Sequence, residues 1–202
     1  NSITTEINSV TDNPIIDVES EYIYHGGNFH GDYSEYAIDQ LKMTIVKLTI
    51  LSERRINFFL NENINKHFPP FMNLDKPGLT LGLQALQFVA TSTTADNQTL
   101  AYPHYTHSIP TNGDNQDVVS MGTDAVLFTA KVIQNAHIVL AIELITLAQA
   151  VDFCNEHKEL SSQSLEYFKK LREVLPVIKE DRVLVYELPK VVEILQKTII
   201  KL

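Results

Sequence analysis

A long apolar segment, residues 118–153, constrains the fold of this chain more than any other feature. Its second half, residues 136–153, is apolar around nearly the whole helical circumference. It carries only four strongly polar or charged side chains: His137, Glu143, Gln149 and Asp152. These groups and the shortness of the apolar stretch argue against a membrane span. We therefore expect a buried helix in a multi-helix bundle that other subunits complete.

Helical periodicity predicts further helices at about 32–61, 79–100, 161–175 and 189–202. In the first of these, apolar residues recur at helical spacing: Ile38, Leu41, Ile45 and Leu48. This helix opens with Asp32 and Glu35, whose spacing fits a capping box, and the last has Pro189 in its first turn. Residues 1–7 can end another helix, and 15–23 can form a short extended excursion. The predicted fold class is all-α.

Composition and charge argue against several classes of function. With 16 basic and 25 acidic residues, the formal net charge is −9, which disfavours binding to nucleic-acid phosphates. A single cysteine, Cys154, excludes an internal disulfide and fits a reducing cytoplasm. Residues 1–6 show no signal peptide and no starting Met, so we expect a cytoplasmic fragment or processed product.

Residues 108–122, here called the polar loop, separate two more regular segments. The turn-forming residues in it are Pro110, Asn112, Gly113 and Asp114. Asn115, Gln116 and Asp117 then place three hydrogen-bonding side chains before the long helix. Such a loop either carries chemistry on a rigid scaffold or caps the helix, here with Asp117 as the N-cap. Composition alone favours the capping interpretation.

The segment before the polar loop is rich in aromatic and imidazole groups. His104 and His107 are spaced as metal ligands could be. No cysteine and no third histidine lies at a suitable distance in the sequence, and two histidines alone are weak support for zinc. We therefore predict no metal site.

Five short motifs occur in order along the chain. They are Asn8-Ser-Val-Thr-Asp-Asn-Pro14, Gly26-Gly-Asn-Phe-His30, Ser52-Glu-Arg-Arg-Ile56, the polar loop, and Leu140-Ala-Ile-Glu-Leu144. Together they closely resemble the aromatic amino acid lyase family, which includes histidine, phenylalanine and tyrosine ammonia-lyases. The resemblance covers about residues 6–153 and, more loosely, the tail.

The resemblance implies a long-helix bundle of the ammonia-lyase/fumarase-aspartase type that lacks the amino-terminal domain. Residues 1–202 would form the carboxyl-terminal part of the helical lyase domain. Within it, residues 1–153 would supply the long-helix core and active-site loops, and residues 154–202 the carboxyl-terminal helices. Family members are homotetramers whose sites combine several subunits, so the resemblance implies a tetramer.

The family eliminates ammonia and a β proton from an aromatic amino acid, which leaves an unsaturated acid. Its members use an electrophile, 4-methylideneimidazol-5-one (MIO), made from an internal Ala-Ser-Gly. This chain contains no Ala-Ser-Gly. The resemblance also places the family's catalytic tyrosine and carboxylate-binding arginine upstream of Asn1. We therefore assign no catalytic residue here and expect the chain to be inactive by itself.

The resemblance assigns four residues to a substrate pocket: Phe29, Gln84, Asn115 and Gln116. Phe29 matches an aromatic residue that packs near the electrophile, although core packing is its plainer alternative. Gln116 matches the position of a glutamate in histidine-specific members, and an amide can neither act as a general base nor pair with a cation. Gln84 matches a position that is apolar in some histidine-type members, and it would need a partner such as a phenol or Gln116.

The two glutamines favour tyrosine or phenylalanine as substrate. Histidine ammonia-lyase is the nearest alternative, followed by an aminomutase, which uses the same electrophile but returns the ammonia to the β carbon. A non-catalytic helical assembly module is the alternative from a different class. The charged motif residues Arg54, Arg55 and Glu143 are expected to be structural, since a buried carboxylate needs a partner.

Overall fold

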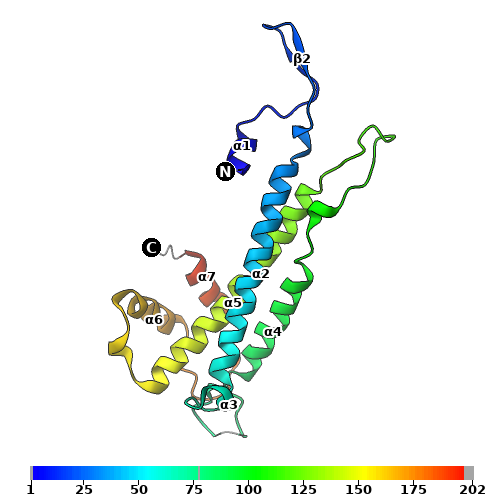
Figure 1. Ribbon diagram of the computed structural model, residues 1–202. Coiled ribbons are helices and arrows are strands. Elements are labelled where there is room, and N and C mark those ends of the chain that lie inside the picture. The colour runs from blue at the N-terminus through cyan, green and yellow to red at the C-terminus, as the bar shows by residue number, and fades with distance from the viewer. Residues whose placement is uncertain (1, 77, 198–202) are drawn as a thin grey trace. The chain divides into compact units, whose positions relative to one another are not determined.

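A computed structural model describes residues 2–76 and 78–197, and this part of the chain is helical apart from one small hairpin (Figure 1). The long helices are α2 (Asp32–Leu60), α4 (Gln84–Thr99) and α5 (Gly122–Cys154). The shorter ones are α1 (Ser2–Ile7), α3 (Glu62–Asn65), α6 (Ser162–Val174) and α7 (Leu188–Lys197). The 3-10 turns are η1 (Asn28–His30), η2 (Pro70–Met72), η3 (His104–Thr106) and η4 (His157–Glu159). The all-α prediction is confirmed.

The chain divides into two compact units, and α2 and α5 each contribute to both. Unit 1 contains Asn1–Ile45 and Thr99–Ile133, and unit 2 contains Val46–Gln98 and Gln134–Leu202. Unit 1 includes the hairpin of β1 (Ile15–Asp17) and β2 (Tyr22–Tyr24), which pair antiparallel with Ile15 opposite Tyr24. The expected extended excursion is therefore a two-stranded ribbon.

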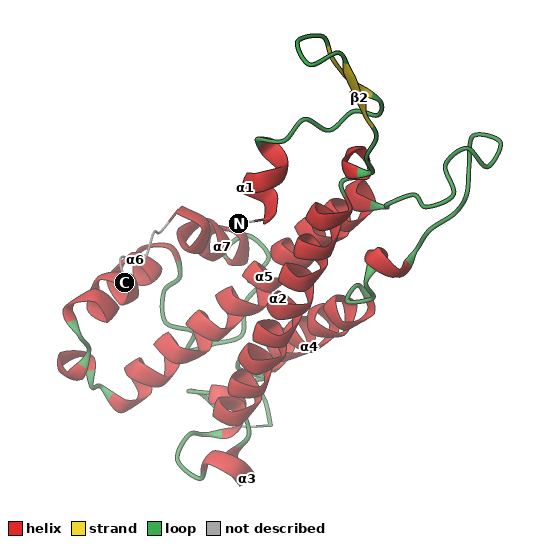
Figure 2. Cartoon of the chain, turned by 45° about the horizontal axis from the view of Figure 1, so that its top comes forward, coloured by secondary structure: helices red, strands yellow, loops and turns green. Residues whose placement is uncertain are grey.

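Unit 2 holds the main apolar core. In it the second half of α2 lies beside α4, and the second half of α5 runs at an angle to α2 and leads toward α6 (Figure 2). The buried side chains include Ile56 of α2, Leu86 of α4, and Ile142 and Ile145 of α5. The tail packs on the same cluster through Leu171, Leu175, Ile178 and Val191. Burial of this kind stabilises a fold by roughly 25 cal/mol per Å² of apolar surface.

The structure corrects the starts of two predicted helices. Helix α4 begins at Gln84 and not near residue 79, because Gly82 has a left-handed φ of +59° that ends the preceding turn. Helix α5 begins at Gly122 and not at Val118. Asp117 is therefore not its N-cap, and the Asp117 Oδ1 atom instead accepts a hydrogen bond from the Val118 amide at 2.9 Å.

The prediction of a capping box at Asp32 and Glu35 is also wrong. The Glu35 Oε2 atom accepts from the Met121 amide at 3.1 Å, so this carboxylate serves another element. The remaining helix ends agree more closely with the sequence. Ser161 caps α6 by accepting from the Ser164 amide, and Pro189 is the second residue of α7. The predicted end of that helix at 198–202 lies outside the described residues.

Helix α5 is long and apolar enough to cross a membrane, judged by length and composition alone. Half of its most apolar stretch is nevertheless buried within the chain, as in the core helix of a bundle. Further apolar side chains on the long helices remain exposed, among them Leu41, Leu48, Leu51 and Phe58 of α2 and Val126, Leu127, Leu140 and Leu147 of α5. A chain with this much exposed apolar helix surface is suited to packing against other protein.

Candidate active-site loops

The tip of the polar loop is a tight hairpin. Thr111 and Gln116 pair through both backbone hydrogen bonds, with N···O distances of 3.0 Å and 3.3 Å. Between them, Asn112, Gly113 and Asp114 have left-handed backbone angles with φ of 58°, 63° and 62°. Asn, Asp and Gly tolerate that conformation better than other residues, which explains why the sequence uses them here. Asn115 and Gln116 therefore sit on a defined backbone.

The side chains of the two predicted pocket residues on this hairpin remain available. Asn115 is exposed and Gln116 is half-buried. Within residues 2–76 and 78–197, neither amide group makes a side-chain hydrogen bond. Each offers a carbonyl acceptor and an N–H₂ donor, so both can orient a polar ligand without carrying charge.

The structure joins the segment that carries Phe29 to the end of the polar loop. The Ser120 hydroxyl donates to the His30 backbone carbonyl, directly after Phe29. The Val119 amide donates to the Ser108 hydroxyl at 3.0 Å, which closes the base of the loop. Phe29 itself is 40% exposed and stacks on His30 with ring centroids 4.1 Å apart. Its ring is therefore not part of this chain's own core.

A hollow of about 380 Å³ lies beside this junction in unit 1. It is lined by Gly27, Asn28, His30, Asp32, Tyr33, Tyr105 and Val118. The Asp32 carboxylate raises the pKa of the Tyr105 phenol above its ordinary value, both by its charge and by a hydrogen bond. Tyr105 therefore stays neutral at physiological pH, with its O–H donated to Asp32, and it is not a ready base.

Gln84 belongs to unit 2, whereas the other three predicted pocket residues, Phe29, Asn115 and Gln116, belong to unit 1. It is half-buried and lines a small hollow of about 240 Å³ with Phe71, Asn73 and Thr80 among its neighbours. The turn before it is fixed by Asp181, whose carboxylate accepts from the Leu81 amide at 2.8 Å and from the Gly82 amide at 3.1 Å. Its pairing with a phenol or with Gln116 stays a prediction.

The two histidines considered as metal ligands have other surroundings. Their ring centroids are 5.4 Å apart, and the His104 Nδ1 atom lies 3.1 Å from the Lys42 ammonium. Burial, together with the Lys42 charge, lowers the pKa of His104. Among the described residues, no group of three or more His, Cys, Asp or Glu side chains is placed to hold a metal ion.

Sequence reasoning missed the buried charges of α2. Glu35, Asp39 and Lys42 are each at most 1% exposed and contact the segments at both ends of the polar loop. Their spacing of four and three residues was a usable signal, because it places all three on one helical face. The apolar periodicity of the same helix concealed it.

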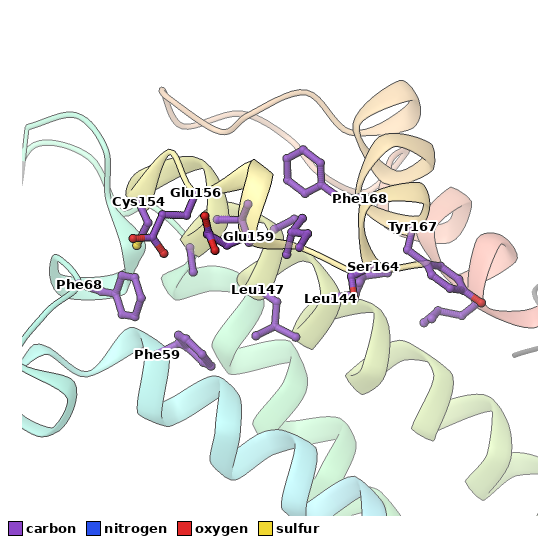
Figure 3. Close-up of a pocket in the computed structure, with 15 residues that line it drawn as sticks. Phe59, Phe68, Leu144, Leu147, Cys154, Glu156, Glu159, Ser164, Tyr167 and Phe168 are labelled. Carbon is purple, nitrogen blue, oxygen red and sulfur yellow. The ribbon is translucent and has the colours of Figure 1, made fainter. Parts of the chain in front are cut away.

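A cavity of about 560 Å³ lies in unit 2, and none of the predicted pocket residues lines it. Figure 3 shows its mainly apolar wall, with Phe59, Phe68 and Leu147 near α2 and α5 and with Tyr167 and Phe168 on α6. Glu156, Glu159, Ser164 and Tyr167 also line it, but most of its surface is apolar.

The family profile described as "Aromatic amino acid lyase" matches residues 1–173. This chain belongs to the aromatic amino acid lyase family. It is 39% identical over 193 residues to a histidine ammonia-lyase of Bacillus subtilis and 36% identical over 180 residues to a tyrosine ammonia-lyase of Cupriavidus metallidurans. The crystal structure of a tyrosine aminomutase from Streptomyces globisporus superposes with a TM-score of 0.92 at 35% identity.

These lyase-family relatives are much longer than the chain. The matches cover 95% and 89% of this chain but only 37% and 34% of the two ammonia-lyases. For the aminomutase structure the corresponding shares are 97% and 37%. The chain thus spans slightly more than a third of its relatives, and the helical bundle of the family is the fold it shares with them.

Proposed function

We propose that this chain is the carboxyl-terminal part of an ammonia-lyase that converts tyrosine or phenylalanine into the corresponding unsaturated acid. The observation that carries the choice of substrate is the pair of uncharged amide side chains, Asn115 and Gln116, at the hairpin of the polar loop. Histidine-specific members carry a glutamate at the position of Gln116, and this chain offers no charge there. The relatives include both histidine and tyrosine enzymes, so overall identity does not decide between them.

In this proposal the residues of the chain bind and orient the substrate. The Asn115 and Gln116 amides hydrogen-bond polar atoms of the amino acid, and Phe29 packs on the aromatic or reacting part. The phenol of Tyr105, kept neutral by Asp32, lines the hollow beside Phe29 and can accept a hydrogen bond there. The 202 residues contain no Ala-Ser-Gly, so this chain does not form MIO itself. When present, MIO supplies the electrophile that activates the ammonium as a leaving group.

We also propose that the complete polypeptide is a cytoplasmic homotetramer and that the isolated chain is inactive. The exposed apolar side chains of α2 and α5 support assembly with further protein. Light scattering of the complete polypeptide checks the tetramer, and a monomeric mass would contradict it. An assay of the isolated chain with tyrosine, phenylalanine and histidine checks whether it is inactive.

The decisive experiment offers tyrosine, phenylalanine and histidine separately to the complete polypeptide that contains this segment. Ultraviolet absorbance follows the conjugated acid, and chromatography detects any β-amino acid. Turnover of tyrosine or phenylalanine to the acid supports the proposal. A preference for histidine would overturn the argument from Gln116, and a β-amino acid would identify an aminomutase.

A matched variant isolates the contribution of Gln116. Gln116→Glu restores the carboxylate found in histidine-specific members, and it should raise kcat/KM for histidine while lowering that for tyrosine. Asn115→Asp is the control, because it adds the same charge one residue away on the same hairpin. Equal effects of the two variants would show that position 116 has no special part in selectivity.

A further inference from the structure

The first half of α2 buries three charged side chains on one face. Glu35, Asp39 and Lys42 are 1%, 1% and 0% exposed, respectively. Burying a charge is unfavourable unless the group is paired and hydrogen-bonded, so each of these residues needs compensating contacts. Their contacts show what the cluster holds.

Lys42 and Asp39 hold the segment that leads into the polar loop. The Lys42 ammonium lies 2.7 Å from the Asp39 Oδ1 atom, and it donates to the Tyr102 carbonyl at 2.8 Å. It also lies 3.1 Å from the His104 Nδ1 atom. The Asp39 Oδ2 atom accepts from the Tyr105 amide at 2.8 Å. Three hydrogen bonds therefore join this ion pair to residues 102–105.

Glu35 holds the other end of the loop. Its Oε2 atom accepts from the Met121 amide at 3.1 Å, one residue before α5 begins. The amides at a helix N-terminus lack partners within the helix and carry partial positive charge, so an acidic side chain suits this place. A Cβ atom on Gly122 would lie 3.7 Å from the Glu35 Cβ atom, so the two helices already lie close together there.

The contacts of the cluster go to loop backbone as well as between side chains. An apolar face would pack α2 against its neighbours, but it would not fix the position of individual carbonyls and amides. The two ends, at Tyr105 and Met121, lie on either side of Asn115 and Gln116, and the hairpin between them is itself paired. Both anchored residues are held by side chains within two turns of one helix.

We propose that Glu35 and the Asp39–Lys42 pair are positioning residues, which anchor the segment before the polar loop and the end of that loop, and thereby set the place of Asn115 and Gln116. The anchoring stands on the contacts above. Its consequence for substrate binding rests on the proposed function.

The anchoring is tested by hydrogen–deuterium exchange on the complete polypeptide. In Glu35→Ala the Met121 amide should exchange about 10-fold faster or more, because it loses a charge-assisted hydrogen bond. In the double variant Asp39→Leu/Lys42→Met the Tyr105 amide should respond in the same way. The double variant avoids an unpaired buried charge, so it is expected to fold. Lys47→Met, at an exposed lysine further along α2, is the control and should leave both amides unchanged.

Rescue and kinetics separate positioning from a merely structural role. Glu35→Gln keeps an acceptor for the Met121 amide, so it should retain most of the protection that Glu35→Ala loses. For the amino acid that the enzyme accepts, the anchor variants should raise KM by more than they lower kcat. Wild-type exchange at both amides in the folded anchor variants would overturn the proposal, and so would faster exchange with an unchanged KM. If no aromatic amino acid were turned over, the proposed function would fail, whereas the exchange rates would still decide the anchoring.

Discussion

The Arg55 guanidinium pairs with the Glu143 carboxylate, with 2.5 Å between the Arg55 Nε and Glu143 Oε1 atoms. The other carboxylate oxygen accepts from the buried Ser52 hydroxyl at 2.5 Å. Two residues of the Ser-Glu-Arg-Arg motif thus hold the Glu143 carboxylate of α5, and all three groups lie in unit 2. The structural role expected for Glu143 has a physical basis in these contacts.

Removing this carboxylate should destabilise the fold. Glu143→Leu leaves the buried Ser52 hydroxyl without its acceptor and Arg55 without its counter-ion, and we expect a loss of about 1–3 kcal/mol in the free energy of unfolding. Urea denaturation monitored by circular dichroism measures it. Glu193→Gln, in the exposed pair with Lys197, is the control and should change little. An equally small loss in both variants would contradict the role given to Glu143.

Gln149 anchors the carboxyl-terminal tail to α5. Its Nε2 atom donates to the Ile178 carbonyl at 2.6 Å, and its Oε1 atom accepts from the Ile178 amide at 3.3 Å. Gln149→Met keeps the size but orphans both backbone groups, so we expect a loss of roughly 2–4 kcal/mol. Urea unfolding and proteolysis of the tail would report it. Unchanged protease resistance after residue 175 would show that apolar packing alone holds the tail.

Gly82 combines a left-handed backbone with a close approach. Its φ is +59°, and an added Cβ would lie 2.8 Å from the Phe71 carbonyl oxygen and 2.9 Å from the Asn73 Cα atom. Gly78 has a φ of +88° but open space around it, so Gly78→Ala is a matched control. We expect Gly78→Ala to cost roughly 1 kcal/mol and Gly82→Ala clearly more, because only the second adds a steric clash. Equal melting temperatures for the two variants would refute this explanation.

Glu35 should make stability depend on pH. Burial raises the pKa of its carboxyl group, and the charges of Asp32 and Asp39 act in the same direction, against the Met121 amide and His107. The stability that an acid with a raised pKa contributes is present below its ordinary pKa and is lost as pH rises through the folded value. Glu35→Gln is neutral throughout, so its stability relative to the wild type should increase from pH 4 to pH 7. Parallel stability curves over that range would mean that Glu35 is not perturbed.

The sequence predicted the number and type of the main helices because their periodicity is local. It missed where α4 and α5 begin, since the starts depend on a left-handed glycine in one case and on a distant carboxylate in the other. It also misread the exposed side of α2. Leu41 and Leu48, which carry the apolar periodicity, are 45% and 57% exposed, whereas Asp39 and Lys42 are buried.

The candidate site was predictable only as separate motifs. The turn chemistry of the polar loop follows from Asn112, Gly113 and Asp114 in the sequence, and the structure shows the hairpin that they form. The link from Ser120 to His30 joins segments 90 residues apart, and no local pattern specifies such a contact. The pocket assignments of Phe29, Gln84, Asn115 and Gln116 remain predictions.

Because Lys42 is completely buried, the rate at which its amine is chemically labelled reports how often the segment that covers it opens. Reagents that acylate amines need the free, solvated group, so they should modify exposed lysines such as Lys47 and Lys131 quickly and Lys42 only while its surroundings are open. Mass spectrometry of a labelling time course would then give the frequency with which the segment over Lys42 lifts away. If Lys42 were labelled to completion as fast as Lys47, the segment over Lys42 would be open most of the time.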